Sequence, residues 1–169
     1  VVHEQGAVRW MDGAAPAAAF ITPTDQGIAD FAGEGLRHFA DEVEVFGRPG
    51  NYLSKAMVLF EALHQHGIRY LEDASQPYAT RREGSVIDHI QYPAQTLRSR
   101  TGDCDDLTVL YASLLESAGV STALVDFPEH VFLLVDTGLL RWEAYRLPLE
   151  DRLTVVYGDR LGIPAEITR

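Results

Sequence analysis

The strongest helical pattern in the chain begins at Cys104. Apolar side chains then recur at the spacing of one helix face, at Leu107, Leu110, Tyr111, Leu114, Leu115 and Ala118. This spacing predicts an amphipathic helix, and Gly119 is a typical residue for its C-terminal cap. Residues 101–103 form a glycine-containing turn before the pattern, so we expect Cys104 at the N-terminus of the helix.

Two earlier segments carry weaker helical patterns. Residues 22–25 are typical of a helix start, and the stripe after them predicts a helix that ends before Gly47. The apolar members of this stripe are Ile28, Phe31, Leu36 and Phe39. A second stripe predicts a helix that Asn51 caps and Gly67 ends. Its apolar members are Leu53, Met57, Leu59, Phe60 and Leu63.

Short apolar runs that are typical of strands follow the Cys104 helix. They lie at residues 121–127, 130–135, 153–157 and 160–167. Gly158 and Asp159 predict a hairpin turn between the last two runs. Earlier in the chain, residues 7–10 and 17–21 predict edge strands or an extended lead-in, and residues 68–71 predict one more short strand. Helices followed by an antiparallel sheet predict the α+β class.

A polar, turn-rich segment separates the early elements from the Cys104 helix. It covers residues 72–93 and contains Pro77, Gly84 and Pro93. Long loops in compact domains are often functional. Because this one leads directly to Cys104, we expect it to form one wall of a cleft.

Composition and charge exclude several classes of function. The chain has 169 residues, which suits one domain, and a formal net charge of −11. That acidity, without a cluster of basic residues, argues against nucleic-acid binding. The longest apolar run is far shorter than the roughly 20 residues that span a membrane, so we expect a soluble domain without membrane insertion. The chain begins at Val1 and shows no signal segment, which suggests a domain cut from a longer protein and leaves its location open.

The single cysteine and a later histidine are the main candidates for chemistry. The backbone amides and dipole at a helix N-terminus favour a thiolate at Cys104. His130 opens the 130–135 strand, and a cysteine paired with a histidine forms a thiol nucleophile site. The alternatives are a buried structural cysteine and a histidine of the core. Three aspartates surround the cysteine and predict a partly solvated segment: Asp103, Asp105 and Asp106.

A histidine base also needs a group that orients its ring. The candidates in this part of the chain are Asp136, Glu143 and Glu166. Asp136 lies on the His130 strand, roughly 20 Å away if the strand is fully extended, so it is excluded unless the chain bends. Glu166 lies on a strand that could pair beside the His130 strand, whereas Glu143 lies in a segment without an assigned element.

These residues resemble the motifs of a known superfamily. Residues 93–107, Pro-Ala-Gln-Thr-Leu-Arg-Ser-Arg-Thr-Gly-Asp-Cys-Asp-Asp-Leu, look like the cysteine motif of the transglutaminase-like superfamily. Residues 128–133, Pro-Glu-His-Val-Phe-Leu, look like its histidine motif, and residues 163–168 complete the order cysteine, histidine, acid. The resemblance covers about residues 68–169 and is most specific over the first two motifs. The family often has a tryptophan before the Ile-Pro pair, where this chain has Gly162.

The resemblance implies a fold and a chemistry. The fold would be a papain-like α+β core over residues 68–169, with residues 1–67 as an N-terminal extension and helices that pack on it. Cys104 would head the central helix, and His130 and Glu166 would lie on neighbouring strands. The chemistry would be acyl transfer through a thioester on a protein or peptide substrate. Two glutamines of the preceding loop are candidate oxyanion donors, Gln91 and Gln95.

Within this resemblance, a cysteine protease, peptidase or amidase is the first hypothesis. Transglutaminase-type cross-linking requires a dry, aromatic-walled tunnel, and neither Trp10 nor Trp142 adjoins a motif. A non-catalytic peptide-binding module of a larger scaffold is the alternative from another class. In each case the remaining domains of the parent protein would be partners.

No cofactor is expected. The contiguous carboxylates of Asp103, Asp105 and Asp106 are hard oxygen ligands, which leaves calcium as an alternative. Their spacing differs from that of an EF-hand loop. A zinc site is not predicted, because the single cysteine has no histidine near it in the sequence.

Overall fold

The protein has the α+β architecture that the sequence predicts. The computed structural model describes residues 7–8, 15–41, 52–72, 88–127, 130–147 and 153–168. The helices are η2 (Ala15–Phe20), α1 (Gln26–His38), α3 (Tyr52–His66), α4 (Pro93–Ser99), α5 (Cys104–Ser117) and η4 (Arg141–Arg146), of which η2 and η4 are 3₁₀ helices. The strands are β1 (Ala7–Val8), β2 (Arg69–Tyr70), β3 (Asp88–His89), β4 (Thr101–Gly102), β5 (Thr122–Phe127), β6 (His130–Leu140), β7 (Val155–Tyr157) and β8 (Arg160–Ala165).

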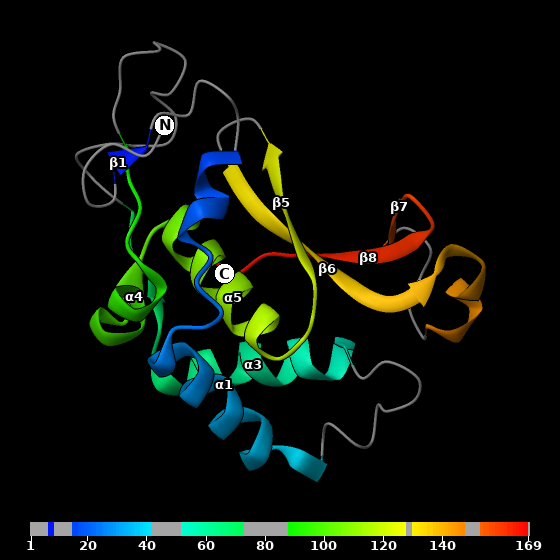
Figure 1. Cartoon of the computed structure of the whole chain (residues 1–169), viewed down its shortest axis with the longest axis horizontal. Coiled ribbons are helices and arrows are strands. Elements are labelled where there is room, and N and C mark those ends of the chain that lie inside the picture. The colour runs from blue at the N-terminus through cyan, green and yellow to red at the C-terminus, as the bar shows by residue number, and fades with distance from the viewer. Residues whose placement is uncertain are drawn as a thin grey trace.

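Helix α5 is the centre of the molecule. It contacts α1, α3 and α4 as well as β5 and β6, and Figure 1 shows it between the helices and the sheet. Every residue from position 104 to position 115 is buried. The sequence predicts one apolar face, but the structure buries this helix on all sides. Its polar residues are therefore inside the protein, where each needs a hydrogen-bond partner.

The sheet behind α5 is antiparallel, with the strand order β5-β6-β8-β7. The β7–β8 hairpin turns at Gly158, whose φ of +61° is the left-handed conformation that glycine adopts without strain. The predicted hairpin and the pairing of β6 with β8 are confirmed. Strand β6 is longer than predicted and continues to Leu140.

One hydrophobic cluster joins the early helices to the later elements. Ile28 of α1, Leu59 of α3, Leu110 of α5 and Leu133 of β6 all belong to it and are buried. The N-terminal helices thus share their core with the helix and strand that carry Cys104 and His130. In the described part of the chain, no helix has both the length and the apolar character needed to cross a bilayer.

The prediction of an extended segment at residues 17–21 is wrong. Residues Ala15–Phe20 form the 3₁₀ helix η2, which buries Phe20. Alanine is depleted in strands, and Pro16 fits the first turn of a helix because its φ is fixed near −65°. Of the predicted strand at residues 7–10, Ala7–Val8 form β1 beside β3, and the remainder lies outside the described residues.

The two predicted early helices are present. Asp25 caps α1 by accepting hydrogen bonds from the backbone N–H groups of Gly27 and Ile28. Helix α1 ends at His38, earlier than the predicted limit, and Gly47 lies outside the described residues. Helix α3 matches the second predicted helix, but its predicted cap Asn51 is also outside the described part.

Helix α4 is an element that the sequence analysis missed. It begins with Pro93, and the Gln95 side chain accepts a hydrogen bond from the backbone N–H of Tyr92 at 3.0 Å. A proline at the first position and a glutamine at the third are recognised signals of a helix N-terminus. The predicted polar segment ends at Pro93, and the sequence analysis assigns no element to residues 94–100, whereas these two signals indicate a helix that begins at Pro93.

Gly162 of β8 provides a test of the packing between β8 and its neighbours. A Cβ atom at this position would lie 2.6 Å from Cγ of Leu134 and 2.9 Å from Cε1 of Tyr157. We expect Gly162→Ala to lower the free energy of unfolding by about 1–3 kcal/mol, the usual cost of overpacking a core. Thermal and denaturant unfolding measure this change.

Gly33→Ala in α1 is the matched control, because a Cβ atom there would meet nothing within 4 Å. It should stabilise the protein by about 0.5–1 kcal/mol through helix propensity. Equal effects of the two substitutions would contradict the close approach at Gly162.

Candidate functional site

Cys104 is the first residue of α5 and lies at the junction with the sheet. Asp103 is the N-cap, and its Oδ1 accepts from the backbone N–H of Asp106 at 3.3 Å. Cys104 is only 5 % exposed and packs with Val131, the second residue of β6. The position at the helix N-terminus is therefore as predicted, and the thiol lies against the strand that begins with His130.

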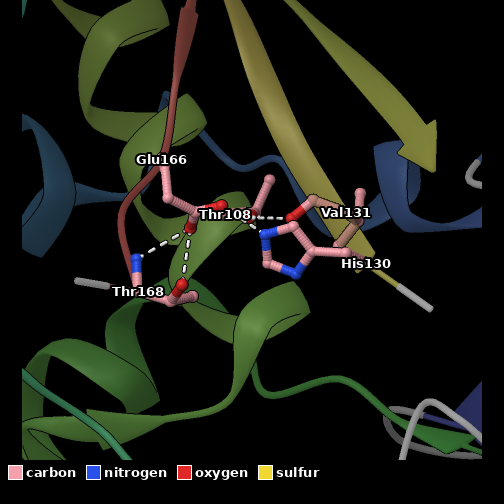
Figure 2. Close-up of polar contacts among 5 residues, drawn as sticks. All are labelled: Thr108, His130, Val131, Glu166 and Thr168. Atoms are coloured by element: carbon pink, nitrogen blue, oxygen red, sulfur yellow. Dashed lines mark hydrogen bonds and ion pairs between the residues drawn. The ribbon is translucent and has the colours of Figure 1, made fainter. Parts of the chain in front are cut away.

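His130 and Glu166 are in direct contact. Nε2 of His130 pairs with Oε2 of Glu166, and Figure 2 shows the second ring nitrogen, Nδ1, facing away from the carboxylate. Both side chains are about one-third exposed, at 31 % and 34 %. An ionised carboxylate only accepts hydrogen bonds, so Nε2 carries a proton and Nδ1 of the neutral ring is the basic nitrogen.

Strand register explains why these two residues meet. Leu133 of β6 is opposite Ala165 of β8, and the next pair in the same register would place Glu166 opposite Phe132. Alternate residues of a strand share one face, so His130 is the diagonal neighbour of Glu166. Diagonal neighbours are about 7–8 Å apart, which a glutamate side chain spans.

Glu166 is held by a second residue, Thr168. Oε1 of Glu166 accepts from the Thr168 backbone N–H at 2.9 Å and from Thr168 Oγ1 at 2.6 Å. Partial burial raises the pKa of Glu166, but the hydrogen bonds from Thr168 and the contact with His130 outweigh it and lower the pKa below its ordinary value. Glu166 is thus stabilised as a carboxylate.

Thr108 joins α5 to the strand of His130. It lies one helical turn after Cys104, and its Oγ1 donates to the backbone oxygen of Val131 at 3.3 Å (Figure 2). Residues four apart lie on the same face of a helix, so the face of α5 that carries Cys104 is directed at the start of β6.

Thr108 and Thr168 were both missed by the sequence analysis. The available signal was spacing: Thr108 is four residues after the cysteine, and Thr168 is two residues after the acid, on the same side of an extended chain.

The other two candidate acids are engaged elsewhere. Asp136 pairs with Arg160 at 3.2 Å and accepts from the Gly138 backbone N–H, as expected for a residue too far along β6 to reach His130. Glu143 accepts from the Leu140 backbone N–H at 3.0 Å, at the start of η4. The structure brings only Glu166, of the three, to His130.

The two candidate oxyanion donors have different environments. Gln91 donates from Nε2 to Oδ2 of Asp106 at 2.6 Å, so its amide is already used in the network beneath the cysteine turn. Gln95 lies in the first turn of α4, where its side chain accepts from the Tyr92 backbone N–H, and it lines a cavity of about 960 Å³ that Gln91 also lines. Their assignment as oxyanion donors stays a prediction.

The cysteine segment is less solvated than predicted, since Cys104, Asp105 and Asp106 are buried and Asp103 is half-buried. Asp105 is 1 % exposed and Asp106 is 4 % exposed. Burial, a hydrogen bond with Asp103 and the charges of nearby acids raise the pKa of Asp105 well above its usual range. Burial and the charge of Asp103 raise the pKa of Asp106 to about 6, against the hydrogen bonds from Gln91. Asp106 completes the capping box with Asp103 and accepts from Gln91, whereas Asp105 is enclosed together with the rest of the helix.

The same three carboxylates are the candidate cation ligands. One ligand oxygen from each of Asp103, Asp105 and Asp106 lies within 4.8 Å of the others. Both oxygens of Asp106 already accept hydrogen bonds from Gln91, which leaves Asp105 Oδ2 as the buried oxygen without a hydrogen-bond partner. Calcium binding here stays a prediction.

A cavity of about 540 Å³ lies against the cysteine turn. Its lining residues are Leu71, Glu72, His89, Gln91, Thr101, Gly102, Asp103 and Asp106. Tyr70 pairs with Gly102 of the cavity lining, and burial together with the charges of Cys104 and Glu72 raises the pKa of its hydroxyl. The predicted cleft wall at residues 72–93 is described only at Glu72 and residues 88–93, and these contribute Glu72, His89 and Gln91 to the lining.

Comparison of the chain with protein-family models, curated proteins and solved structures finds no match in any of the three.

The buried aspartates predict an unusual dependence of stability on pH. Their raised pKa values mean that the folded state binds more protons than the unfolded state above about pH 4. Their stabilising contribution is complete below that pH and is lost as the pH rises through about 6, the pKa of Asp106. We expect Asp105→Asn to raise the melting temperature at pH 7.5 and to leave it near wild type at pH 4.5.

Asp30→Asn on the exposed face of α1 controls for the change in net charge. A wild-type melting temperature that rises steadily from pH 4.5 to 7.5, unaffected by Asp105→Asn, would contradict the assignment. A calcium titration in the same assay tests the cation alternative, since a bound cation would stabilise the wild type and not the Asp105 variant.

Proposed function

We propose that this protein is a cysteine-dependent acyl-transfer enzyme that hydrolyses an amide bond in a protein or peptide. Cys104 is the nucleophile, His130 is the general base and acid, and Glu166 orients the histidine. The contact between His130 Nε2 and Glu166 is the observation that carries the proposal. It is the relation between base and orienting group that thiol and serine nucleophile sites share.

The hydrogen bond of the His130 ring supports the roles assigned to His130 and Cys104. With Nε2 committed to Glu166, Nδ1 is left to accept the proton of Cys104. Cys104 packs on Val131, the residue that follows His130 in β6, and Thr108 joins α5 to β6. The approach of the Cys104 sulfur to Nδ1 is part of the proposal. Transfer of the proton gives a thiolate and an imidazolium. The negatively charged Glu166 carboxylate stabilises the imidazolium.

The reaction then proceeds in two acyl-transfer steps. The thiolate attacks the amide carbonyl, and the backbone N–H of Cys104, at a helix N-terminus, stabilises the oxyanion. His130 donates its Nδ1 proton to the leaving amine as the C–N bond breaks, leaving a thioester. Nδ1 next takes a proton from water, the resulting hydroxide attacks the thioester, and the acid product and the thiol are released.

The resemblance to the transglutaminase-like superfamily gives the same roles to the same residues. In this proposal the α5 helix and the β5–β8 sheet correspond to the papain-like core of that superfamily. Hydrolysis is preferred over amine transfer because Trp142, in η4, is 62 % exposed and so does not wall a dry tunnel. Trp10 lies outside the described residues.

Alkylation of Cys104 tests the proposed pair directly, because the chain has one cysteine. We expect iodoacetamide to react with the wild type at pH 5–6, since a thiolate–imidazolium pair persists well below the usual thiol pKa of about 8.5. His130→Ala should lose this acid-side reactivity and keep only a titration near pH 8.5. Glu166→Gln should retain a reduced part of it.

His89→Ala is the matched histidine control, because His89 lines the neighbouring cavity without contacting Glu166 in the described structure. A single titration near pH 8.5 in the wild type, unchanged by His130→Ala, would contradict the enzyme proposal. The protein would then be a binding module that keeps the fold.

Hydrolysis and amine transfer give different products from one substrate screen. We expect turnover of fluorogenic peptide amides, with water as the acceptor even when a primary amine is added in excess. Cys104→Ala should abolish turnover, a loss of at least about 10³-fold for removal of a nucleophile. Preferential incorporation of the amine into product would replace hydrolysis with the cross-linking activity.

A further inference from the structure

The β6–β8 ladder does not by itself fix the Glu166 side chain. The last β8 residue is Ala165, which pairs with Leu133, so Glu166 lies just past the paired strand. Its side chain is about one-third exposed and has three rotatable bonds. A glutamate in this situation has several rotamers and competes with water for its contacts.

Thr168 restricts the rotamers of the Glu166 side chain, and it does so from the side of the carboxylate opposite His130. The Thr168 backbone N–H and hydroxyl both donate to Oε1, at 2.9 Å and 2.6 Å, while Oε2 points to His130. Figure 2 shows the carboxylate between the two residues, with one oxygen turned to each. Two donors on one oxygen fix the carboxylate plane as well as its position.

We propose that Thr168 is a positioning residue of the site: it holds Glu166 in the orientation that directs Nδ1 of His130 toward Cys104. This inference rests on the proposed function. It assigns the Thr168 hydroxyl a role through Glu166 and His130, without contact with the substrate or the reacting atoms.

The geometry gives the proposed role a specific contact. Thr168 donates to Glu166 alone in the described hydrogen bonds, and both bonds go to the oxygen that His130 does not use. The hydroxyl therefore acts on the acid of the pair.

The test measures the pH profile of Cys104 alkylation by iodoacetamide in Thr168→Val. Valine keeps the shape of threonine and the backbone N–H but removes the hydroxyl donor. We expect the rate at pH 5 to fall about tenfold and the acid limb to move up by about one pH unit, the loss of one hydrogen bond to a charged group. Thr168→Ser should restore the wild-type profile.

Thr122→Val is the matched control. It removes a hydrogen bond of 2.8 Å between a threonine and a glutamate, Thr122 and Glu116, at the end of β5 far from the Phe127–His130 pair. This variant should keep the wild-type profile even if its melting temperature falls by a similar amount. Thr168→Ala provides a second hydroxyl deletion if the valine variant folds poorly.

The outcomes distinguish this inference from the proposed function. If His130→Ala removes the acid-side reactivity and both hydroxyl deletions keep it in full, the role of Thr168 is wrong and the enzyme proposal stands. If His130→Ala also keeps the wild-type profile, the proposed function fails and the inference fails with it. If the acid limb of the alkylation profile moves up in Thr168→Val and Thr168→Ala and returns to its wild-type position in Thr168→Ser, the positioning role is established.

Discussion

The burial of α5 on all sides is the constraint on which the rest of the structure depends. A helix in that position has its polar residues inside the protein, and several of them have specific partners, whereas Asp105 Oδ2 has none among the described residues. Thr108 donates to β6, and the Ser113 hydroxyl accepts from the backbone N–H of Thr22 at 2.9 Å. Each bond fixes a neighbouring element relative to the helix. The sheet and the N-terminal segment are therefore placed by the chemistry of α5.

This arrangement fixes the positions of the candidate site residues. Cys104 begins the most buried helix, and His130 begins the strand that packs on it. Residues on such elements are held more exactly than residues on loops, which suits a reaction that depends on distances of a few tenths of an ångström. Glu166 is the exception, since it follows a strand end and relies on side-chain hydrogen bonds.

Local patterns allow much of the fold to be predicted from the sequence. The alternation of apolar residues and the Gly158 turn predict the β7–β8 hairpin, and the order of elements predicts the α+β class. The contact between His130 and Glu166 also follows from the pairing of β6 with β8, once that pairing is assumed.

The remaining features depend on tertiary contacts that no local window contains. Asp105 is charged and polar in sequence, yet the structure buries it because the whole helix is enclosed. The 3₁₀ helix at Ala15–Phe20 is fixed by the burial of Phe20 against Ile90 and Val109. Thr168 bonds locally to Glu166, two residues before it, but its link to the site depends on the β6–β8 pairing that brings Glu166 to His130.

The acidic residues around the start of α5 also bear on which reagents would approach the cysteine. Asp103 and Glu72 line the cavity against the cysteine turn, and the chain as a whole carries a formal charge of −11. Anionic electrophiles and oxidants approach Cys104 against this field, whereas neutral and cationic ones do not. Under the proposed function, this field would favour uncharged peptide carbonyls over negatively charged disulfides such as oxidised glutathione.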